Sequence, residues 1–172
     1  KALEHLKELG HERIGLLAPL CPMGGLPARE KGYYEAMKEL GLSVNEKYII
    51  PMDHILESCI KQMDEYLDSH TDMPTAFFAV NDAIGVGATI SLKKHGYNVP
   101  GDVSIMGFDD ANIGNSSQPR LSTMKIDGGS IGRIAINRLD HIINGDESVI
   151  RIFLETPLLE KDSTIRRDPS SV

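Results

Sequence analysis

The sequence predicts an α/β fold in which a parallel, doubly wound sheet carries helices on both faces. Four apolar runs are nearly continuous, as expected for strands buried on both sides, and they span 13–18, 48–52, 75–80 and 103–108. Helical patterns separate these runs, whose starts lie about 27 to 35 residues apart, close to the length of a βαβ unit. Right-handed crossovers between such strands produce a twisted parallel sheet.

Three amphipathic helices are predicted between the strands, because apolar residues recur there at i, i+3, i+4 and i+7. These helices span 29–40, 56–69 and 82–94. Gly41 is expected to end the first of them, and Asp82 to cap the amino end of the third. Two more helices, 2–9 and 130–144, fall outside the alternation, and residues 149–159 return to an extended, β-branched pattern.

The composition disfavours several classes of function. At 172 residues the chain can bury a sizeable core, and its formal charge of -7 disfavours contact with the phosphate backbone of nucleic acids. Cys21 and Cys59 form no CxxC motif and no cluster with histidine, which indicates free thiols in a reducing cytoplasm. No apolar run has membrane-spanning length, and no secretory signal is visible. The chain starts at Lys1, within a helical pattern and without Met, as expected for a piece of a longer protein.

Two carboxylates, Asp109 and Asp110, directly follow the predicted strand 103–108. Ligands of open parallel sheets lie beyond the carboxyl ends of the strands, so a contact with a small polar molecule is expected here. Asp109 could accept hydrogen bonds from hydroxyl groups or from a ring N–H. The alternative is that both residues only cap a loop or the next helix.

Arg29 follows the loop after the first strand, so its guanidinium can reach the same edge of the sheet. Its fixed fork of donors suits vicinal hydroxyls or a carboxylate. The alternatives are an arginine at the surface or one paired with Glu30. We predict that the side chains of Arg29 and Asp109 converge over one rim of the sheet, where the loss of either would weaken ligand binding about tenfold or more.

Asn81 and His54 are the other two candidate ligand residues. Asn81 ends the third strand, and its amide can both donate to and accept from a hydroxyl, although it could merely shape the turn. His54 follows the second strand, where an imidazole could hydrogen-bond to a ligand; an exposed loop histidine is the alternative.

The sequence contains little that indicates an enzyme. Gly85 and Gly87 begin a pattern like a dinucleotide-binding fingerprint, but Ile90 replaces its last glycine and the segment is predicted to be mid-helix. No Walker-type lysine loop, GxSxG motif or convincing cysteine–histidine pair is present in the sequence. We therefore predict no catalytic residue, no metal site and no cofactor.

Five motifs in a fixed order carry a family resemblance. They are LKELGHERIG (6–15), AREKGYYEA (28–36), PTAFFAVND (74–82), VPGDVSIMGFD (99–109) and PRLSTM (119–124). Together they resemble the effector-binding domain of the LacI/GalR family of bacterial transcriptional regulators, over about residues 2–166. The resemblance implies a fold like that of a type I periplasmic binding protein, in which two α/β subdomains joined by three crossover strands enclose the ligand.

The resemblance also implies a division of the chain. Residues 1–10 would be a helix of the N-terminal subdomain, and 11–121 most of the C-terminal, effector-binding subdomain. Residues 122–153 would hold a crossover and a segment of the N-terminal subdomain, and 154–172 would return to the C-terminal subdomain and form the tail. The rest of the N-terminal subdomain and a helix-turn-helix headpiece that binds operator DNA would lie upstream of Lys1.

The family pattern extends to single residues. An arginine matching Arg29 and an aspartate matching Asp109 contact the effector in the family, and an aromatic ring that stacks on the ligand often occupies the position of His54. Two departures leave the effector open: the loop 20–26 carries a methionine and two glycines in place of polar contacts, and Ile126 stands where some relatives have a polar residue.

The resemblance implies a dimeric, cytoplasmic regulator that binds a small metabolite, by default a sugar or sugar phosphate, with purines and other metabolites still open. Effector binding would shift the populations of DNA-competent and DNA-incompetent dimers. The dimer surface is expected on the loop 111–118 and the helix 82–94, although that helix could be an ordinary one buried against the sheet. Its small apolar face comprises Ala83, Val86, Gly87 and Ile90.

Two other classes of protein remain as alternatives. One is a periplasmic or secreted sugar-binding protein of the same fold. The other, with less support, is a sugar-modifying α/β enzyme. No contact with a membrane is expected.

Overall fold

A six-stranded sheet organises the chain in the computed structural model, which describes residues 1–21 and 24–167. The strands stand in the order β2-β1-β3-β4-β5-β6, and every neighbouring pair is parallel except β5 with β6. They are β1 (Ile14–Pro19), β2 (Ile49–Met52), β3 (Ala76–Ala79), β4 (Ser104–Asp109), β5 (Ser122–Lys125) and β6 (Leu158–Leu159). The predicted parallel α/β fold is confirmed, and the four predicted strands match β1 to β4 to within one residue at each end.

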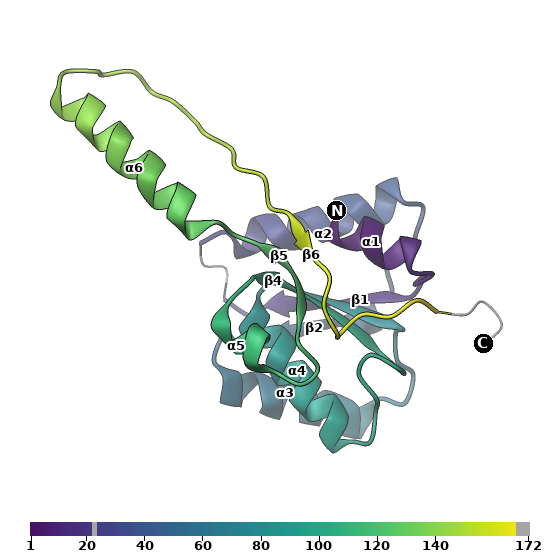
Figure 1. The fold of residues 1–172 in the computed structure, drawn as a ribbon. Coiled ribbons are helices and arrows are strands. Elements are labelled where there is room, and N and C mark those ends of the chain that lie inside the picture. Colours follow the sequence, from purple (N-terminus) through teal and green to yellow (C-terminus); the bar gives the residue numbers. More distant parts are fainter. Residues whose placement is uncertain (22–23, 168–172) are drawn as a thin grey trace.

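Helices cover both faces of the sheet (Figure 1). α1 (Ala2–Glu8) and α2 (Leu26–Glu39) lie on one face, and α3 (Leu56–Ser69) and α4 (Asp82–Lys94) lie on the other. The short helices η1 (Glu46–Tyr48) and α5 (Asn112–Ser116) belong to the connections, and α6 (Gly128–Ile143) follows β5. All four residues of β3 are buried, as expected for a central strand covered on both sides.

Helix α1 packs on this sheet rather than in a separate lobe. Its residues Leu3 and Leu6 are buried in the same core as β1 and β3, and the helix contacts α2. The expected division at residues 10–11 therefore does not separate α1 from the sheet, because the apolar side of this helix completes one face of it.

The amino end of α4 differs from the prediction, while the extent of the helix agrees with it. Asn81 is the N-cap, and its side-chain oxygen accepts a hydrogen bond from the backbone N–H of Ile84 at 2.9 Å. Asp82 is the first helical residue and is 1% exposed. The prediction that Asp82 caps this helix is therefore wrong, since its carboxylate is turned inward to other partners.

Most of the apolar face of α4 is used inside the subunit. A Cβ atom at Gly87 would lie 2.6 Å from the Cβ of Cys59, so α3 packs directly on the backbone of α4. Val86 is also buried and Ala83 is half-buried, whereas Ile90 is exposed. The ordinary packing role that the sequence left open accounts for this face, with Ile90 as the exception.

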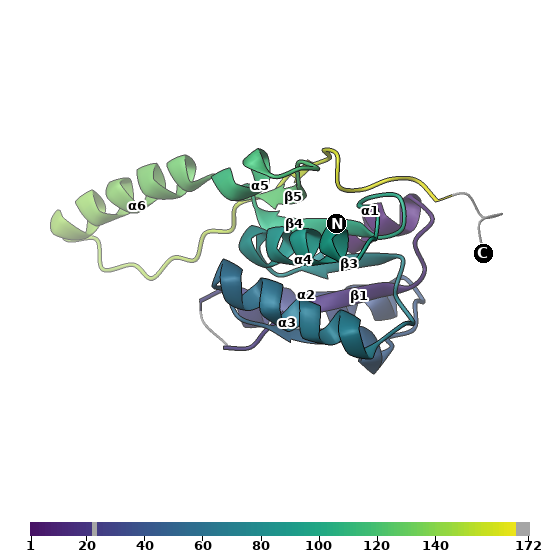
Figure 2. The ribbon, with the colours of Figure 1, turned by 90° about the horizontal axis from the view of Figure 1, so that it is seen from below.

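Helix α6 and the segment after it project beyond the sheet (Figures 1 and 2). No residue of α6 is buried, and the exposed side chains include Ile136, Leu139 and Ile143. Within the returning segment 149–159, for which the sequence predicts an extended pattern, only Leu158–Leu159 pairs with β5. The helix has the amphipathic pattern of a sheet-covering helix, but no strand lies beneath it in the described part of the chain.

Candidate functional site

The candidate site lies at the carboxyl edge of the parallel strands, where the strand order changes direction. The chain passes from β1 outward to β2 on one side, and then to β3 and β4 on the other. In open α/β sheets this reversal opens a crevice beyond the strand ends, which is where ligands bind. The segments after β1 and β3 and the end of β4 carry Arg29, Asn81 and Asp109, and we call these three residues the ligand rim.

Arg29 connects the ends of β3 and β4. Its Nη1 donates a hydrogen bond to the carbonyl oxygen of Val80 at 2.6 Å, and its Nη2 lies 2.8 Å from Oδ1 of Asp109. The Phe108 ring supports the guanidinium, whose Cζ lies 4.0 Å from the ring centroid. The predicted convergence of Arg29 and Asp109 is confirmed, and the alternative pairing of Arg29 with Glu30 is not the one formed.

The pair retains capacity for a ligand. The Arg29 side chain is 16% exposed and the Asp109 side chain is 34% exposed, so both can be reached from solvent. A guanidinium has five N–H donors, and a carboxylate can accept several hydrogen bonds. The rim therefore offers donors and acceptors next to each other, with their charges balanced.

Of the other two predicted ligand residues, Asn81 lies at the rim and His54 does not. Asn81 is half-buried beside Val80, and its side-chain oxygen is engaged in capping α4. Its amide group therefore offers donors, not an acceptor, to the rim. His54 lies beyond β2, on the far side of β1; its ring is half-exposed and its Nδ1 is 3.0 Å from Asp53. His54 contacts no residue of the rim in the described part of the chain.

The turn after β4 separates the roles of its two carboxylates. Asp109 faces Arg29, whereas Oδ1 of Asp110 accepts hydrogen bonds from Nζ of Lys161 at 2.8 Å and from Asn115 at 3.2 Å. Burial alone would raise the pKa of Asp110, but the bonds from Lys161 and Asn115 outweigh burial and hold the pKa below its ordinary value. Asp110 thus fixes the loop, as the alternative interpretation proposed for it, and Asp109 does not.

Asp82 is a buried residue of the site that the sequence did not identify. Its Oδ2 accepts a hydrogen bond from the backbone N–H of Ala111, and its Oδ1 accepts one from the hydroxyl of Thr123, both at 2.7 Å. Burial raises its pKa above the ordinary value, although these two hydrogen bonds act in the opposite direction. The only sequence signal for this residue was its place after a strand, which a helix cap explains equally well.

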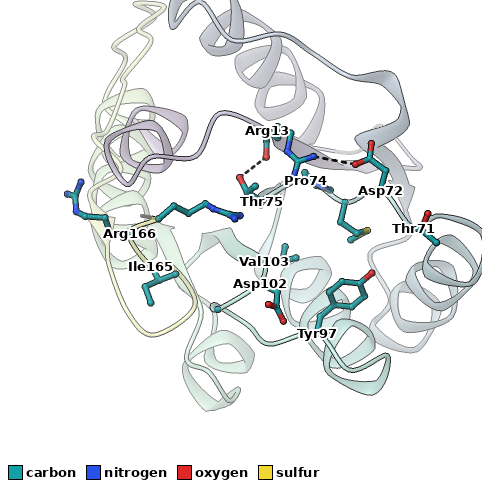
Figure 3. A pocket seen from close by; sticks show the side chains of 13 residues that line it. Arg13, Thr71, Asp72, Pro74, Thr75, Tyr97, Asp102, Val103, Ile165 and Arg166 are labelled. Atoms are coloured by element: carbon teal, nitrogen blue, oxygen red, sulfur yellow. Dashed lines mark hydrogen bonds and ion pairs between the residues drawn. The ribbon is translucent and has the colours of Figure 1, made fainter. Parts of the chain in front are cut away.

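A hollow lies at the opposite, amino end of the strands (Figure 3). It has a volume of about 530 Å³ and is mostly polar. Arg13 lies 3.3 Å from Asp72 and the Thr75 hydroxyl oxygen lies 3.2 Å from the Arg13 carbonyl, so these polar groups have partners within the chain. The ligand rim lies instead at the carboxyl edge of the strands, where open parallel sheets bind their ligands, and is therefore the better candidate.

Among the described residues, no three His, Cys, Asp or Glu side chains gather so that they could hold a metal ion. Within the same part of the chain, no helix combines the length and the apolar character needed to cross a membrane.

The chain is similar in sequence to a known domain family and to bacterial transcriptional repressors. Residues 3–164 match the family described as the periplasmic binding protein-like domain. The HTH-type transcriptional repressor PurR of Photobacterium profundum is 30% identical over 158 residues, which cover 92% of this chain and 47% of PurR. The chain thus spans about half the length of the curated relatives it matches.

Solved structures of transcriptional regulators are also similar to this chain. The transcriptional regulator CelR in complex with cellobiose has a TM-score of 0.83 and 30% identity, and the match covers 93% of this chain and 49% of CelR. The lac repressor dimer bound to operator and the anti-inducer ONPF has a TM-score of 0.85 and 26% identity, over 95% of this chain and 56% of the repressor.

Proposed function

Because the chain belongs to the family of periplasmic binding protein-like domains, we propose that it is the effector-binding part of a LacI-type transcriptional regulator. The ligand rim binds the effector, a small metabolite rich in hydroxyl groups. Enzymatic activity is not part of this function, since PurR and other relatives are transcriptional repressors.

The observation that carries the proposal is the pairing of Arg29 with Asp109 over the ends of β3 and β4. Each hydroxyl of a sugar both donates and accepts a hydrogen bond, so vicinal hydroxyls match a guanidinium beside a carboxylate. A phosphate group would meet the negative charge of Asp109 as well as the positive charge of Arg29. The rim therefore favours a neutral sugar over a sugar phosphate at this position, and the cellobiose in the CelR complex is a molecule of this class.

The regulator is proposed to act as a cytoplasmic dimer that binds operator DNA through a segment outside this chain. The lac repressor match is a dimer on its operator, and the formal charge of -7 disfavours DNA contact by the residues present here. On the side of the subunit where α3 and α4 pack, exposed Ile90 and the loop 111–118 are the proposed dimer surface. Effector binding at the rim would shift the equilibrium between two arrangements of the dimer.

The test is a thermal-shift screen with cellobiose, glucose 6-phosphate and hypoxanthine on the wild-type chain. A compound that binds the folded state raises the Tm by mass action as its concentration rises. Arg29→Lys removes the bidentate fork and is expected to weaken binding of cellobiose about tenfold or more. Arg13→Lys is the matched control, because Arg13 pairs with Asp72 at the opposite end of the strands.

Three outcomes would contradict the proposal. Cellobiose binding that Arg29→Lys and Asp109→Asn leave unchanged would remove the rim as the site. A larger shift with glucose 6-phosphate than with cellobiose would overturn the preference for a neutral sugar. Conversion of any of these compounds by the protein, followed by NMR, would favour the enzyme alternative.

A further inference from the structure

We propose that Asp82 is the positioning residue of the ligand rim, and that it joins the rim to the strand that leads into α6. The inference rests on the proposed function, since it concerns how the same rim is kept in shape. Asp82 does not need to touch the effector. It acts through the backbone of the turn that presents Asp109.

The turn that presents Asp109 has an unusual backbone. The φ angle is 122° at Asp109 and 60° at Asp110, a region that residues with a side chain rarely adopt. Two consecutive residues of this kind persist only where the surrounding structure holds them. The turn therefore requires specific contacts, and these contacts decide where the Asp109 carboxylate lies.

Asp82 supplies contacts to the backbone directly after Asp109. Its Oδ2 accepts the N–H of Ala111 at 2.7 Å, and its Oδ1 accepts the hydroxyl proton of Thr123 at 2.7 Å. The Thr123 oxygen in turn accepts the N–H of Asp110 at 3.4 Å, a long contact. One buried carboxylate thus holds the amide of Ala111 directly and the amide of Asp110 through a threonine.

The chain makes room for this carboxylate. A Cβ atom at Gly107 would lie 2.3 Å from Oδ1 of Asp82, so any other residue at this position of β4 would displace it. Asp82 is 1% exposed, which means that its hydrogen-bond acceptors are used inside the protein. Lys161 holds the side chain of Asp110, but within the described chain its ammonium group donates to side chains and not to the backbone of the turn, so it cannot replace Asp82.

The same contacts extend to the connection with α6. Thr123 belongs to β5, which α6 follows after a short link, and the N–H of Ile126 in that link donates to the carbonyl of Asp109 at 3.2 Å. A change in the position of β5 therefore moves the hydroxyl that holds the turn. We infer that the geometry of the rim and the position of the β5–α6 connection depend on each other.

The test compares four variants with the wild-type chain. Asp82→Ala and Thr123→Val each remove one partner of the hydrogen bond between these two side chains. Asp82→Asn keeps the shape of the side chain, with an oxygen that accepts the N–H of Ala111 and an amide N–H that donates to the Thr123 oxygen. Thr89→Val is the matched control, because its buried hydroxyl also belongs to α4 but donates to Gly85, away from the rim. Hydrogen exchange of the amides of Asp110 and Ala111 is measured by NMR, relative to the amide of Ile105 in β4.

Asp82→Ala and Thr123→Val are expected to speed exchange at Ala111 or Asp110 at least tenfold relative to Ile105, with Asp82→Asn close to the wild type. Thr89→Val should change Ile105 and the turn in parallel, as any loss of stability would. Unchanged relative exchange in Asp82→Ala, or the same effect in Thr89→Val, would overturn the proposal. If Asp82→Ala does not fold, Thr123→Val decides.

Cellobiose affinity adds a second readout. It should fall at least tenfold in Thr123→Val and stay at the wild-type value in Thr89→Val. Equal affinity in Thr123→Val and wild type would also refute the positioning role. If the wild type does not bind cellobiose, that result counts against the proposed ligand, and the exchange data alone decide about Asp82.

Discussion

The buried imidazole of His11 makes the stability of this chain depend on pH in a way that can be calculated. Its Nε2 lies 3.1 Å from the carbonyl of Ile165 and its Nδ1 lies 3.0 Å from the hydroxyl of Thr75, so it joins the segment after α1 to the end of the described chain. A carbonyl only accepts, so Nε2 carries the proton of the neutral ring. Burial lowers the pKa of His11 from 6.5 to about 4; the Ile165 bond opposes this shift and nearby Arg167 adds to it.

The sign and the size of the effect follow from linkage. Above the ordinary pKa of 6.5 both states are neutral, and the full stability is present. As the pH falls toward 4, the unfolded chain takes up a proton that the folded chain does not. Each pH unit between these limits changes the free energy of unfolding by roughly 1.4 kcal/mol. The free energy of unfolding should therefore fall by about 3 kcal/mol from pH 6.5 to pH 4.

Urea unfolding followed by circular dichroism at pH 7.5, 6, 5 and 4 measures this dependence. In His11→Gln the amide can donate to Ile165 but does not titrate, so wild type should lose about 3 kcal/mol more than the variant over this range. His54→Gln removes a half-exposed histidine and is the control. Parallel pH profiles for wild type and His11→Gln would refute the reasoning, because the carboxylates contribute equally to both.

Three further predictions concern the site and the core. Arg29→Met leaves Asp109 without its cation and the Val80 carbonyl without a donor, so unfolding by urea should show a loss of about 2–4 kcal/mol; an unchanged stability would contradict the contacts described. Gly107→Ala places a methyl group 2.3 Å from the Asp82 carboxylate and should cost at least about 1–3 kcal/mol in the same assay, with Gly32→Ala, which meets no neighbouring atom, as control. At pH 8, iodoacetamide should modify exposed Cys21 in the folded protein and leave Cys59 unmodified until urea unfolds the chain, because Cys59 is buried and its pKa is raised to about 11; equal labelling of both thiols, read by mass spectrometry, would be inconsistent with this packing.

The local elements of the fold could be predicted from the sequence because they depend on local patterns. Strands β1 to β4 are largely apolar on both faces, and α3 and α4 have the predicted bounds. Strand β5 was not predicted as a strand, because Ser122 and Thr123 interrupt the apolar pattern while being fully buried. Their hydroxyl groups are satisfied by Thr164 and Asp82, which are distant in the sequence.

The candidate site could be predicted in part for the same reason. Polar residues after strands identified Arg29, Asn81 and Asp109, since the carboxyl ends of parallel strands share one edge. Beyond the pairing of Arg29 with Asp109, local patterns could not say which partners these residues would have, such as the Val80 carbonyl for Arg29. Asn81 rather than Asp82 caps α4, because the oxygen of Asn81 accepts the N–H of Ile84 whereas the carboxylate of Asp82 is turned to Thr123.

The amino-acid sequence by itself determined the alternation of strands and helices and the places where polar side chains leave the strands. Only the tertiary structure decided that Arg29 also donates to the Val80 carbonyl, that α1 belongs to the same sheet and that Asp82 is buried beneath the turn. The reason is physical: periodicity records which face of an element is apolar, whereas the choice of partners depends on strand order and on which distant groups satisfy each buried hydrogen bond.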